Sequence, residues 1–592
     1  MLIDRLIVGN PRPWLGGALA VAMIVTLSMG QPAAASQAQP GPAPKIHPTF
    51  AARLEAAENP VKTWVFFTDK GHLTDGQYES AIRRLHVTYD RRAIQRRQLR
   101  RTAPGLFDAR DLPVADAYID AVSATGAELH ITSRWLNAVS ARVTAAQARA
   151  IAALPFVKSI EPVRRARRFD PPPPDGEQVP AAPRGGRGFY GAAEEQLAQI
   201  NLIALHDEGA TAQGIIVGIL DTGFVRTHEA FNHPDHPLQV IAEYDFINMD
   251  ENTGIEEGDP SNQHRHGTMI LGTLGAYMPE ELVGGAYDAS FILCKTEDTS
   301  DEYPGEEDNY VAGLEFIEAN GGDVSTSSLI YLDWYTQEDM DGQTAVTTIA
   351  VNAATENGLY CCTAAGNEGH DQNPQTSHLG APADAFQVIT CGAVESTGEI
   401  AGFSGDGPTA DDRVKPEVLA RGVSTHTVNP DNDYGYDTAS GTSLSTPVVA
   451  GAVACIAQAQ PTWTVDQLRQ FLFVTADYYV ANGTFDPLYI YGYGVIDAYG
   501  AVALDCNHNG VFDDQDIDNG TSEDVNGNGI PDECECLADC AEPFDGVVNT
   551  VDLLALLAEW GGSGTPRDIN YDGIINTADL LALLAAWGPC PE

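Results

Sequence analysis

Short apolar runs alternate with helical stretches between residues 191 and 503, and this alternation constrains the possible folds of the 592-residue chain more than any other feature. The runs are IIVGIL, ASFILCK, GLYCCTAAG and QVITCGAV, and a longer apolar stretch, PVVAGAVACIAQAQ, has the length of a helix. Strands that alternate with helices form mostly parallel sheets. We therefore predict an α/β domain with its functional residues at the carboxyl ends of the strands.

Three short motifs in this region carry the residue types of nucleophilic catalysis. Asp221 stands in DTG after the run IIVGIL, His266 stands in HGT before an apolar helical run, and Ser443 stands in GTSLSTP before the long helix. A serine hydroxyl becomes nucleophilic when an imidazole accepts its proton, and a buried carboxylate holds that imidazole in the required tautomer. We predict that Asp221, His266 and Ser443 form a catalytic triad in the order Asp, His, Ser.

A fourth motif, AAGNEG, places Asn367 on the loop after the run GLYCCTAA. Its side-chain amide can donate to a developing oxyanion together with the backbone N–H of Ser443 near a helix start. The loss of one such donor typically costs about 3 kcal/mol of transition-state stabilisation. We therefore add Asn367 to the predicted catalytic residues.

The first 35 residues have the pattern of a signal peptide. Arg5 and Arg12 precede an apolar stretch over residues 14–29, and three alanines follow at residues 33–35. A membrane anchor is the alternative, but the apolar stretch is short for a membrane span. We expect residues 1–35 to direct secretion, and we predict no transmembrane segment after their removal.

Residues 60–163, within an N-terminal segment that we bound at residues 36–168, are predicted to form a small α+β domain. The strands VKTWVFF, ELHITS and NAVSARV alternate with the helical segments RRAIQRRQLRR and TAAQARAIAAL. A basic run over residues 164–168 and a Pro- and Gly-rich linker over residues 169–188 follow. The basic run is either a solvated loop or, as its position at a domain junction favours, a processing region.

Charge divides the chain into two regions. The net charge is −50, and 25 of the 33 Lys and Arg residues precede Phe189. The strongly acidic remainder argues against nucleic acid or anionic membrane as a partner and favours bound cations.

The segments ILDTGF, HGT, AAGNEG, KPEVLARG, GTSLSTP and GYGVIDAYGAV together resemble the subtilase family, and residues 60–163 resemble its inhibitory propeptide. This resemblance implies a three-layer α/β/α catalytic domain over residues 189–504. It also implies a serine endopeptidase that acts on proteins or peptides, is inhibited by its own propeptide and removes that propeptide autocatalytically. His264 lacks the Gly-Thr that follows the family's base, so we expect it to be a loop residue.

Two features near the cleft bear on the substrate. The family usually has Ser-Leu-Gly where this chain has Ser328-Leu329-Ile330, so Ile330 is predicted either to narrow the cleft or to shift the backbone pairing with the substrate. The run Glu306-Glu307-Asp308 is expected to be a solvated acidic face, although a helix start beside the cleft that favours basic substrates is the alternative.

The C-terminal region has three stretches with the ligand spacing of a calcium loop. Oxygen-bearing residues occupy positions 1, 3, 5, 9 and 12, the seventh residue offers its carbonyl, and Gly510, Gly529 and Gly573 stand at position 6. The predicted Ca²⁺ ligands are Asp505, Asn507, Asn509, Val511, Asp513 and Asp516; Asp524, Asn526, Asn528, Ile530, Asp532 and Glu535; and Asp568, Asn570, Asp572, Ile574, Asn576 and Asp579. A flexible Asn/Asp/Gly-rich linker is the alternative.

An internal repeat divides this C-terminal region, because residues 546–560 return at residues 573–587. Residues 505–536 resemble thrombospondin type 3 calcium repeats, and residues 537–592 resemble a dockerin. The first half of the repeat has Ala541 and Pro543 at ligand positions, and its helices lack the polar residues expected for cohesin recognition. The partner of this region is therefore either cohesin-like or a cell-surface anchoring partner. We expect the region to be a separate tail.

The ten cysteines form two groups with different expected roles. Cys294, Cys361, Cys362, Cys391 and Cys455 lie in apolar runs and are predicted to be buried thiols. Cys506, Cys534, Cys536, Cys540 and Cys590 lie among polar loops and are predicted to include disulfides of undetermined connectivity.

Two functions other than proteolysis fit parts of this pattern. An inactive relative could serve as a calcium-dependent adhesin, and a structural protein could cleave only its own propeptide. Because every catalytic position is filled, the sequence favours an active serine endopeptidase.

Overall fold

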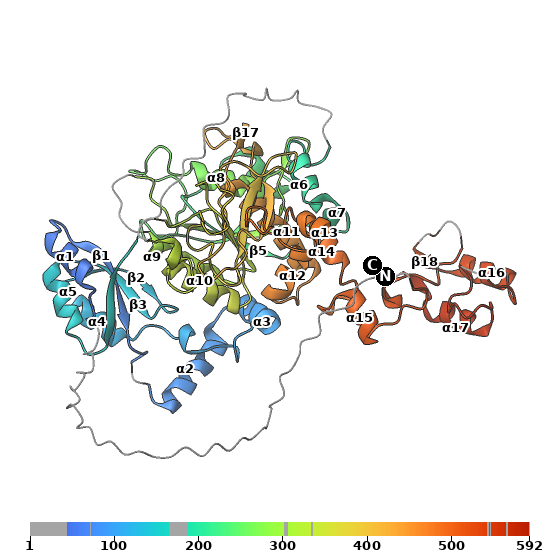
Figure 1. Cartoon of the computed structure of the whole chain (residues 1–592), viewed down its shortest axis with the longest axis horizontal. Coiled ribbons are helices and arrows are strands. Elements are labelled where there is room, and N and C mark those ends of the chain that lie inside the picture. Colours follow the sequence, from blue (N-terminus) through green and yellow to red (C-terminus); the bar gives the residue numbers. More distant parts are fainter. Residues whose placement is uncertain are drawn as a thin grey trace, which may run out of the picture. The chain divides into compact units, whose positions relative to one another are not determined.

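The computed structural model describes residues 44–71, 73–164, 188–300, 306–332, 335–527, 529–541, 544, 546–563 and 566–590. The predicted signal peptide lies outside the described residues, as does the predicted linker apart from Gly188. Residues 45–592 form one unit in which a four-stranded domain, a seven-stranded domain and a tail follow one another along the chain (Figure 1).

The large sheet is entirely parallel and has the order β15-β14-β13-β12-β5-β11-β8. This confirms the predicted α/β class. Its strands are β5 (Ile216–Asp221), β8 (Gln239–Asp245), β11 (Ser290–Lys295), β12 (Val324–Ser327), β13 (Tyr360–Ala364), β14 (Ile389–Val394) and β15 (Val418–Arg421).

Alternate residues of the central strand β5 pack into two different cores. Val217 and Ile219 belong to the core that contains α8, α11, α12 and α14, whereas Ile216 and Leu220 belong to the core that contains α9 and α10. Figure 1 shows these two helical layers on either side of β5. The three-layer arrangement is therefore confirmed. The layer helices are α8 (Arg265–Gly275), α9 (Glu307–Ala319), α10 (Val346–Glu356), α11 (Thr442–Ala459), α12 (Val465–Thr475) and α14 (Ala498–Ala503).

Helix α11 is the one helix among the described residues that is long and apolar enough to cross a membrane. The mean hydropathy of α11 is 1.3, and 83% of this 18-residue helix is buried inside the protein. The apolarity of α11 therefore serves the core between the sheet and α8.

Shorter elements complete the seven-stranded domain and border its loops. They are α6 (Glu194–Gln199), α7 (Leu202–Asp207), α13 (Asp477–Asn482), β6 (Asn232–His233), β7 (His236–Pro237), β9 (Tyr277–Met278), β10 (Leu282–Val283), β16 (Thr425–Val428) and β17 (Tyr436–Ala439).

The N-terminal domain has an antiparallel sheet of order β2-β3-β1-β4, and its own small core includes Phe67, Val139 and Ile160. The predicted α+β domain is therefore present. Its elements are α1 (Pro48–Ala56), β1 (Val61–Phe67), α2 (Asp75–Thr88), α3 (Arg91–Arg100), α4 (Asp116–Ser123), β2 (Glu128–Ser133), β3 (Ala138–Val143), α5 (Ala145–Ala152) and β4 (Val157–Pro162).

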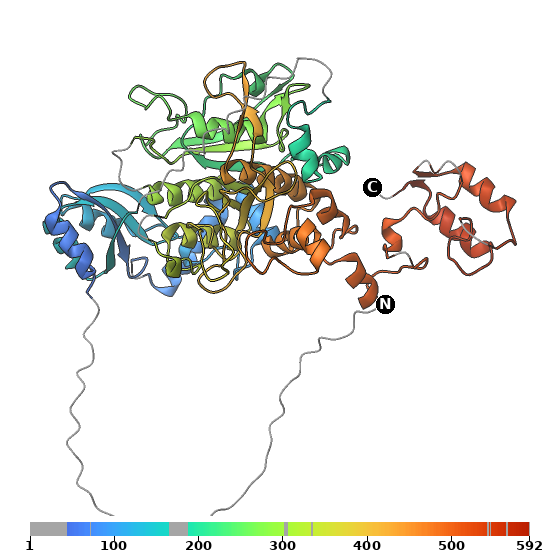
Figure 2. The ribbon, with the colours of Figure 1, turned by 45° about the horizontal axis from the view of Figure 1, so that its top comes forward.

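One face of this small sheet packs on α9 of the large domain, and Figure 2 shows the small sheet beside that domain. Trp64 and Trp135 share a core with Tyr310 and Leu314 of α9. A sheet that buries one face on a partner needs apolar residues on that face as well as on its own core face. Trp64 and Val65 are consecutive residues of β1 on opposite faces of the sheet, and they accordingly belong to different cores.

The acidic run at the start of α9 is buried, so the expectation of a solvated face is wrong. Glu306, Glu307 and Asp308 are 6%, 1% and 0% exposed. The ammonium of Lys62 lies 2.8 Å from Asp308, and the backbone N–H of Arg164 donates to Glu307. The N-terminal domain covers the run and supplies these partners, which the sequence of α9 alone cannot indicate.

The tail begins with a segment that packs on the large domain rather than standing apart. The indole of Trp463 donates to Asp505 Oδ2 at 2.7 Å, and the amides of Gln460 and Gln467 donate to the carbonyls of Asp505 and Gly510. The first loop of the tail therefore contacts the large domain. The tail elements are α15 (Asp513–Asn519), β18 (Val547–Val548), α16 (Thr550–Ala558), α17 (Thr577–Ala585) and β19 (Gly588–Pro589).

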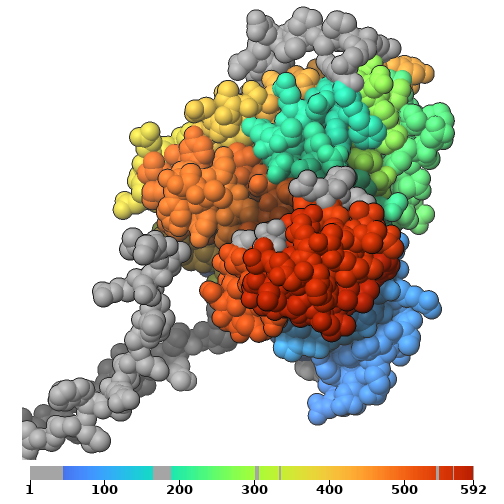
Figure 3. All heavy atoms as spheres, turned by 90° about the vertical axis from the view of Figure 1, so that its right-hand side faces the viewer, coloured from blue at the N-terminus to red at the C-terminus, as the bar shows by residue number. Residues whose placement is uncertain are grey.

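The cysteines behave as predicted. The five middle cysteines are buried thiols, and two disulfides in the tail join Cys506 to Cys534 and Cys536 to Cys590. Cys540 is a buried thiol in the small core that it shares with residues of α16 and α17. Figure 3 shows the C-terminal residues, coloured red, as a compact group of atoms.

Candidate active site

Asp221 and His266 meet at the carboxyl end of β5. Asp221 is the last residue of the strand and is fully buried, and His266 lies in the first turn of α8. Nδ1 of His266 lies 2.8 Å from Oδ1 and 3.0 Å from Oδ2 of Asp221. The backbone N–H and the hydroxyl of Thr222 donate to Oδ1 at 2.7 and 3.2 Å, which fixes the carboxylate.

The glycines beside these two residues are required by close packing. A Cβ on Gly267 would lie 2.3 Å from the carbonyl oxygen of Gly223, and Gly223 itself has a φ of +120°. A side chain at Gly267 would therefore push α8 away from β5. The tripeptides DTG and HGT thus bring the carboxylate and the imidazole together.

Ser443 lies in the first turn of α11. Its backbone N–H has no acceptor within the helix, because the N–H groups of the first turn precede the first helical hydrogen bond. Pro447 stands four residues later and removes the N–H that would bond to the Ser443 carbonyl. That carbonyl instead accepts from Ser328 Oγ at 2.9 Å. Ser328 and Pro447 thereby anchor the turn that carries Ser443, and the proline of GTSLSTP is the one sequence signal for this contact.

Asn367 is held by the residue that precedes Ser443. Its Oδ1 accepts from the backbone N–H of Thr442 at 2.8 Å and from the Thr442 hydroxyl at 3.0 Å. Because Oδ1 is occupied by these donors, the Nδ2 amino group is the part of the amide that can serve a substrate. The structure thus brings Asn367 and Ser443 together, as the sequence predicts.

Ile330 fills space between two glycines near Asn367. A Cβ on Gly366 would lie 3.0 Å from Ile330 Cδ1, and a Cβ on Gly380 would lie 3.1 Å from Ile330 Cβ. Ile330 is 4% exposed, yet it belongs to no apolar core cluster among the described residues. Its side chain packs against the backbone of Gly380 and of Gly366, the residue that precedes Asn367.

His264 is placed away from the Asp221 carboxylate. It occupies the N-cap position of α8, its Nε2 lies 2.8 Å from the Gly254 carbonyl, and burial lowers its pKa. The assignment of His266 rather than His264 to the Asp221 pair agrees with these contacts.

Asp245, Asp250 and Glu256 are the one group of predominantly carboxylate ligands outside the tail that could hold a metal ion in the described ranges. The ammonium of Lys295 lies 2.8 Å from Asp245 and 3.8 Å from Glu256. The single charge of Lys295 therefore offsets part of the negative charge of this cluster.

The first predicted calcium loop is a closed turn in the structure. Asp505 accepts from the backbone N–H groups of Asn509 and Gly510, and Asp516 accepts from the amides of Asn507 and Asn509. Asp513 accepts from the backbone of Cys506 at the same turn. These hydrogen bonds fold the loop on itself, and the backbone N–H of Val511 donates to Asn509 Oδ1 within it.

The second predicted loop is described only in part, because Asn528 lies outside the described residues. Asp524 accepts from the backbone N–H groups of Gly527 and Gly529, and Glu535 accepts from the amide of Asn526. Asp532 accepts from the backbone of Val525, and Ile530 is exposed at the turn.

The third predicted loop contains a buried oxygen with no partner. Asp568 is 4% exposed, its Oδ2 accepts from the backbone of Gly573, and its Oδ1 has no hydrogen-bond partner within the described residues. Asp579 closes the loop by accepting from the backbone of Asn570 and Asn576. Asp572 and Ile574 complete the turn. An unsatisfied buried carboxylate oxygen in a ring of Asp and Asn side chains suits a hard cation.

Comparison with known proteins places this site in a family. Residues 212–494 match the Subtilase family. Subtilisin E of Bacillus subtilis (strain 168) is 30% identical over 384 residues, which are 64% of this chain and 85% of that protein. The chain belongs to the subtilase family. The subtilisin of Bacillus pumilus is 32% identical over 307 residues, which are 52% of this chain and 97% of that protein.

The comparisons also cover the N-terminal domain and the fold of this subtilase. Residues 62–174 match the Peptidase S8 propeptide domain, Bacteroidota. Fervidolysin from Fervidobacterium pennivorans, a keratinolytic enzyme related to subtilisin, superposes with a TM-score of 0.50 at 21% identity. The superposition covers 75% of this chain and 61% of fervidolysin, and it shows a shared fold. The chain is thus a serine endopeptidase of the subtilase family with a propeptide domain.

Proposed function

We propose that this subtilase hydrolyses peptide bonds through an acyl-enzyme on Ser443, with His266 as general base, Asp221 as the residue that orients it and Asn367 in the oxyanion hole. The observation that carries the proposal is the Asp221–His266 contact of 2.8 Å at the end of β5. Four separate motifs of the family supply the four residues.

The proposed reaction uses each group at a defined atom. Nδ1 of His266 faces Asp221, so Nε2 accepts the proton of Ser443 as Oγ attacks the substrate carbonyl carbon. The oxyanion accepts from Asn367 Nδ2 and from the Ser443 backbone N–H. His266 then protonates the leaving amine as the C–N bond breaks, and a water molecule hydrolyses the ester by the same route.

We propose that the cleft beside Ser443 takes substrates with small side chains. Ile330 fills the space between Gly366 and Gly380, next to the loop that bears Asn367. A large substrate side chain at this place would collide with the Ile330 side chain.

We propose further that residues 1–35 direct secretion and that residues 36–168 are the inhibitory propeptide, cut away in or near the linker over residues 169–188. The match of residues 62–174 to a propeptide domain and the similarity to subtilisins support this proposal.

The tail over residues 505–592 is proposed to bind Ca²⁺ and to anchor the enzyme or bind another protein. The unpartnered oxygen of Asp568 favours a cation in the third loop. Exposed apolar side chains on α16 and α17, including Leu554, Leu557, Leu581 and Leu584, favour a protein partner, which could be cohesin-like or a cell-surface component.

Autoprocessing tests the proposed nucleophile. The Ser443→Ala chain should accumulate as an uncut precursor, because the residue that attacks substrates also releases the propeptide. Ser445→Ala is a matched control on the same helix, since its hydroxyl is buried and donates to the Thr442 carbonyl. Normal processing of purified Ser443→Ala without added protease would reject the proposal.

A further inference from the structure

Glu318, near the end of α9, has all of its recorded charged partners in the propeptide. Its Oε1 accepts from Arg96 and from Arg97, the latter at 2.9 Å, and its Oε2 accepts from Tyr89 and from Arg134, the latter at 3.0 Å. Burial alone would raise the pKa of Glu318, but the three guanidinium charges outweigh it and lower the pKa to about 2. The catalytic domain therefore carries a fully buried carboxylate that is neutralised by the propeptide.

Most of these partners come from one segment, residues 89–111, which we call the arginine arm. Arg96 of the arm is 2% exposed and contacts four oxygen atoms of the catalytic domain. Besides Glu318 Oε1, its guanidinium donates to the backbone carbonyls of Glu318, Gly322 and Asn357. The last carbonyls of a helix lack intrahelical donors. Arg96 thus supplies hydrogen bonds to the ends of both α9 and α10.

Arg100 makes a second set of contacts one turn further along α3. Its Nε donates to the Pro461 carbonyl at 2.9 Å, and its guanidinium lies 3.3 Å from Asp323 and 4.7 Å from the centre of the Tyr360 ring. The arm therefore contacts α9, α10 and the loop before α12 at the same time.

Two glycines of the catalytic domain allow the arm to approach its backbone closely. A Cβ on Gly321 would lie 2.7 Å from Arg92 Cβ, and a Cβ on Gly358 would lie 2.6 Å from Arg100 Cβ. Shape and charge are therefore both complementary at this contact.

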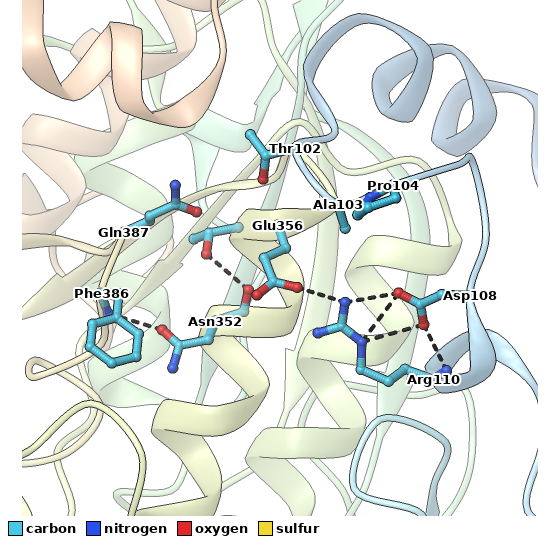
Figure 4. A pocket seen from close by; sticks show the side chains of 10 residues that line it. Thr102, Ala103, Pro104, Asp108, Arg110, Asn352, Glu356, Phe386 and Gln387 are labelled. Carbon is cyan, nitrogen blue, oxygen red and sulfur yellow. Dashed lines mark hydrogen bonds and ion pairs between the residues drawn. The ribbon is translucent and has the colours of Figure 1, made fainter.

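The edge of the contact is an open pocket between the arm and α10. Figure 4 shows Arg110 reaching from the arm to Glu356 of α10, with Asp108 holding the same guanidinium. The backbone N–H of Thr102 donates to the Glu356 carbonyl at 3.1 Å. The pocket is lined by Thr102, Ala103, Pro104, Asn352, Phe386 and Gln387.

This contact lies at the opposite end of the sheet from the catalytic residues. Gly322 and Asp323 precede β12, and Asn357 and Gly358 precede β13, whereas Ser328 and Asn367 follow those two strands. In a parallel sheet all amino ends share one edge. The arm therefore binds at the end of the sheet where the parallel strands begin, which we call the amino edge. It does not enter the substrate cleft, which lies at the other end.

We propose that the amino edge around Glu318, Asp323 and Asn357 is a second binding site for the propeptide, specific for the arginine arm, which keeps the propeptide on the enzyme after the linker has been cut. The proposal rests on the proposed function of residues 36–168 as a propeptide. The small sheet and the arm bind the catalytic domain at two places, and α2, which has no buried residues, joins them along the chain. The two together therefore act as a bivalent ligand.

The test uses the full-length Ser443→Ala chain with a cleavage site for an added protease placed within residues 169–188. After the cut, the rate at which the propeptide leaves the enzyme is measured by dilution and size-exclusion chromatography. We expect the combined substitutions Arg96→Ala, Arg97→Ala and Arg100→Ala to raise this rate by about 100-fold or more, because each leaves a buried charge or carbonyl unpaired.

The matched control removes three exposed arginines of the same region, with Arg83→Ala, Arg84→Ala and Arg91→Ala. It changes the net charge equally, and we expect the rate to stay within about threefold of the unmodified chain. Equal rates for the two triple variants would overturn the proposal, as would immediate loss of the propeptide from the unmodified cut chain.

If the buried triple variant does not fold, the single substitution Arg100→Ala decides the matter. Its partner Asp323 is partly exposed, so folding should survive, and we expect a rate about tenfold faster than that of Arg91→Ala. Equal rates would again overturn the proposal. The assay needs no catalytic activity, so a failure of Ser443 as nucleophile would appear in autoprocessing and not here.

Discussion

The side-chain carbonyl of Asn367 accepts two hydrogen bonds from Thr442, one from the backbone N–H at 2.8 Å and one from the hydroxyl at 3.0 Å. The loop after β13 is thereby fixed to the residue that precedes Ser443. A preorganised donor stabilises a transition-state charge without reorganisation during the reaction. The amide of Asn367, to which we assign the oxyanion-hole role, is thus held in a fixed orientation.

Removal of the amide should lower catalysis strongly. We expect Asn367→Ala to reduce kcat by about 10²- to 10³-fold with a much smaller change in KM, because the amide acts on the oxyanion of the transition state. Steady-state kinetics on the processed enzyme measure this, with Asn373→Ala on the exposed loop nearby as the control. An unchanged kcat for Asn367→Ala would remove Asn367 from the oxyanion hole.

The cleft should widen when Ile330 is shortened. Ile330→Gly removes the side chain that lies between Gly366 and Gly380. We expect kcat/KM to rise at least about tenfold for peptides with a large aromatic residue before the cleaved bond, relative to peptides with alanine there. Cleavage of a matched peptide pair measures the ratio. An unchanged ratio would show that Ile330 does not line the pocket.

Acid should weaken the precursor through Glu318. Its pKa is lowered from 4.5 to about 2 in the folded precursor, so the unfolded chain binds more protons between these values. The stabilisation is present above pH 4.5 and is lost as the pH falls toward 2, by an amount on the order of 3 kcal/mol. Urea unfolding of Ser443→Ala at a series of pH values measures the slope.

The matched variants for this measurement are Glu318→Gln, which should flatten the slope in that window, and the exposed Glu58→Gln, which should leave it unchanged. A Glu318→Gln chain with the original acid dependence would contradict the assigned role of the carboxylate.

Calcium binding should depend on Asp568. We expect Asp568→Asn to abolish one Ca²⁺-binding event in titration calorimetry of the full-length Ser443→Ala chain, because its buried oxygen has no other partner in the described structure. Asp514→Asn, an exposed residue outside the ligand positions, is the control. Equal stoichiometry for the two variants would exclude the third loop as a Ca²⁺ site.

The first calcium loop should couple the tail to the catalytic domain. Asp505 accepts from the Trp463 indole, so ordering of this loop by Ca²⁺ should stabilise α12 by mass action.

Local patterns predicted the catalytic domain well, because its requirements are local. Asp221 and His266 stand beside glycines that close packing demands, and the alternating runs report a buried parallel sheet. The contact of Ser328 with the Ser443 carbonyl was missed, although Pro447 four residues after Ser443 was a usable signal.

Features that depend on a distant partner could not be predicted. The run from Glu306 to Asp308 is polar in sequence but buried by Lys62 and Arg164 of the propeptide. Glu318 and Arg96 form an ion pair although they are 222 residues apart in the chain, and no periodic pattern in the sequence relates the two positions. Buried pairs of this kind are screened little by salt, so propeptide binding should depend on salt less than the charge count alone predicts.

The most direct test of the central claim is covalent labelling by a serine-directed fluorophosphonate, followed by mass spectrometry of the processed enzyme. The account predicts one labelled residue, Ser443, and no labelling of a His266→Ala chain that has been freed of its propeptide by an added protease. A label on another residue, or an unlabelled enzyme that still cleaves peptides, would contradict Ser443 as the nucleophile.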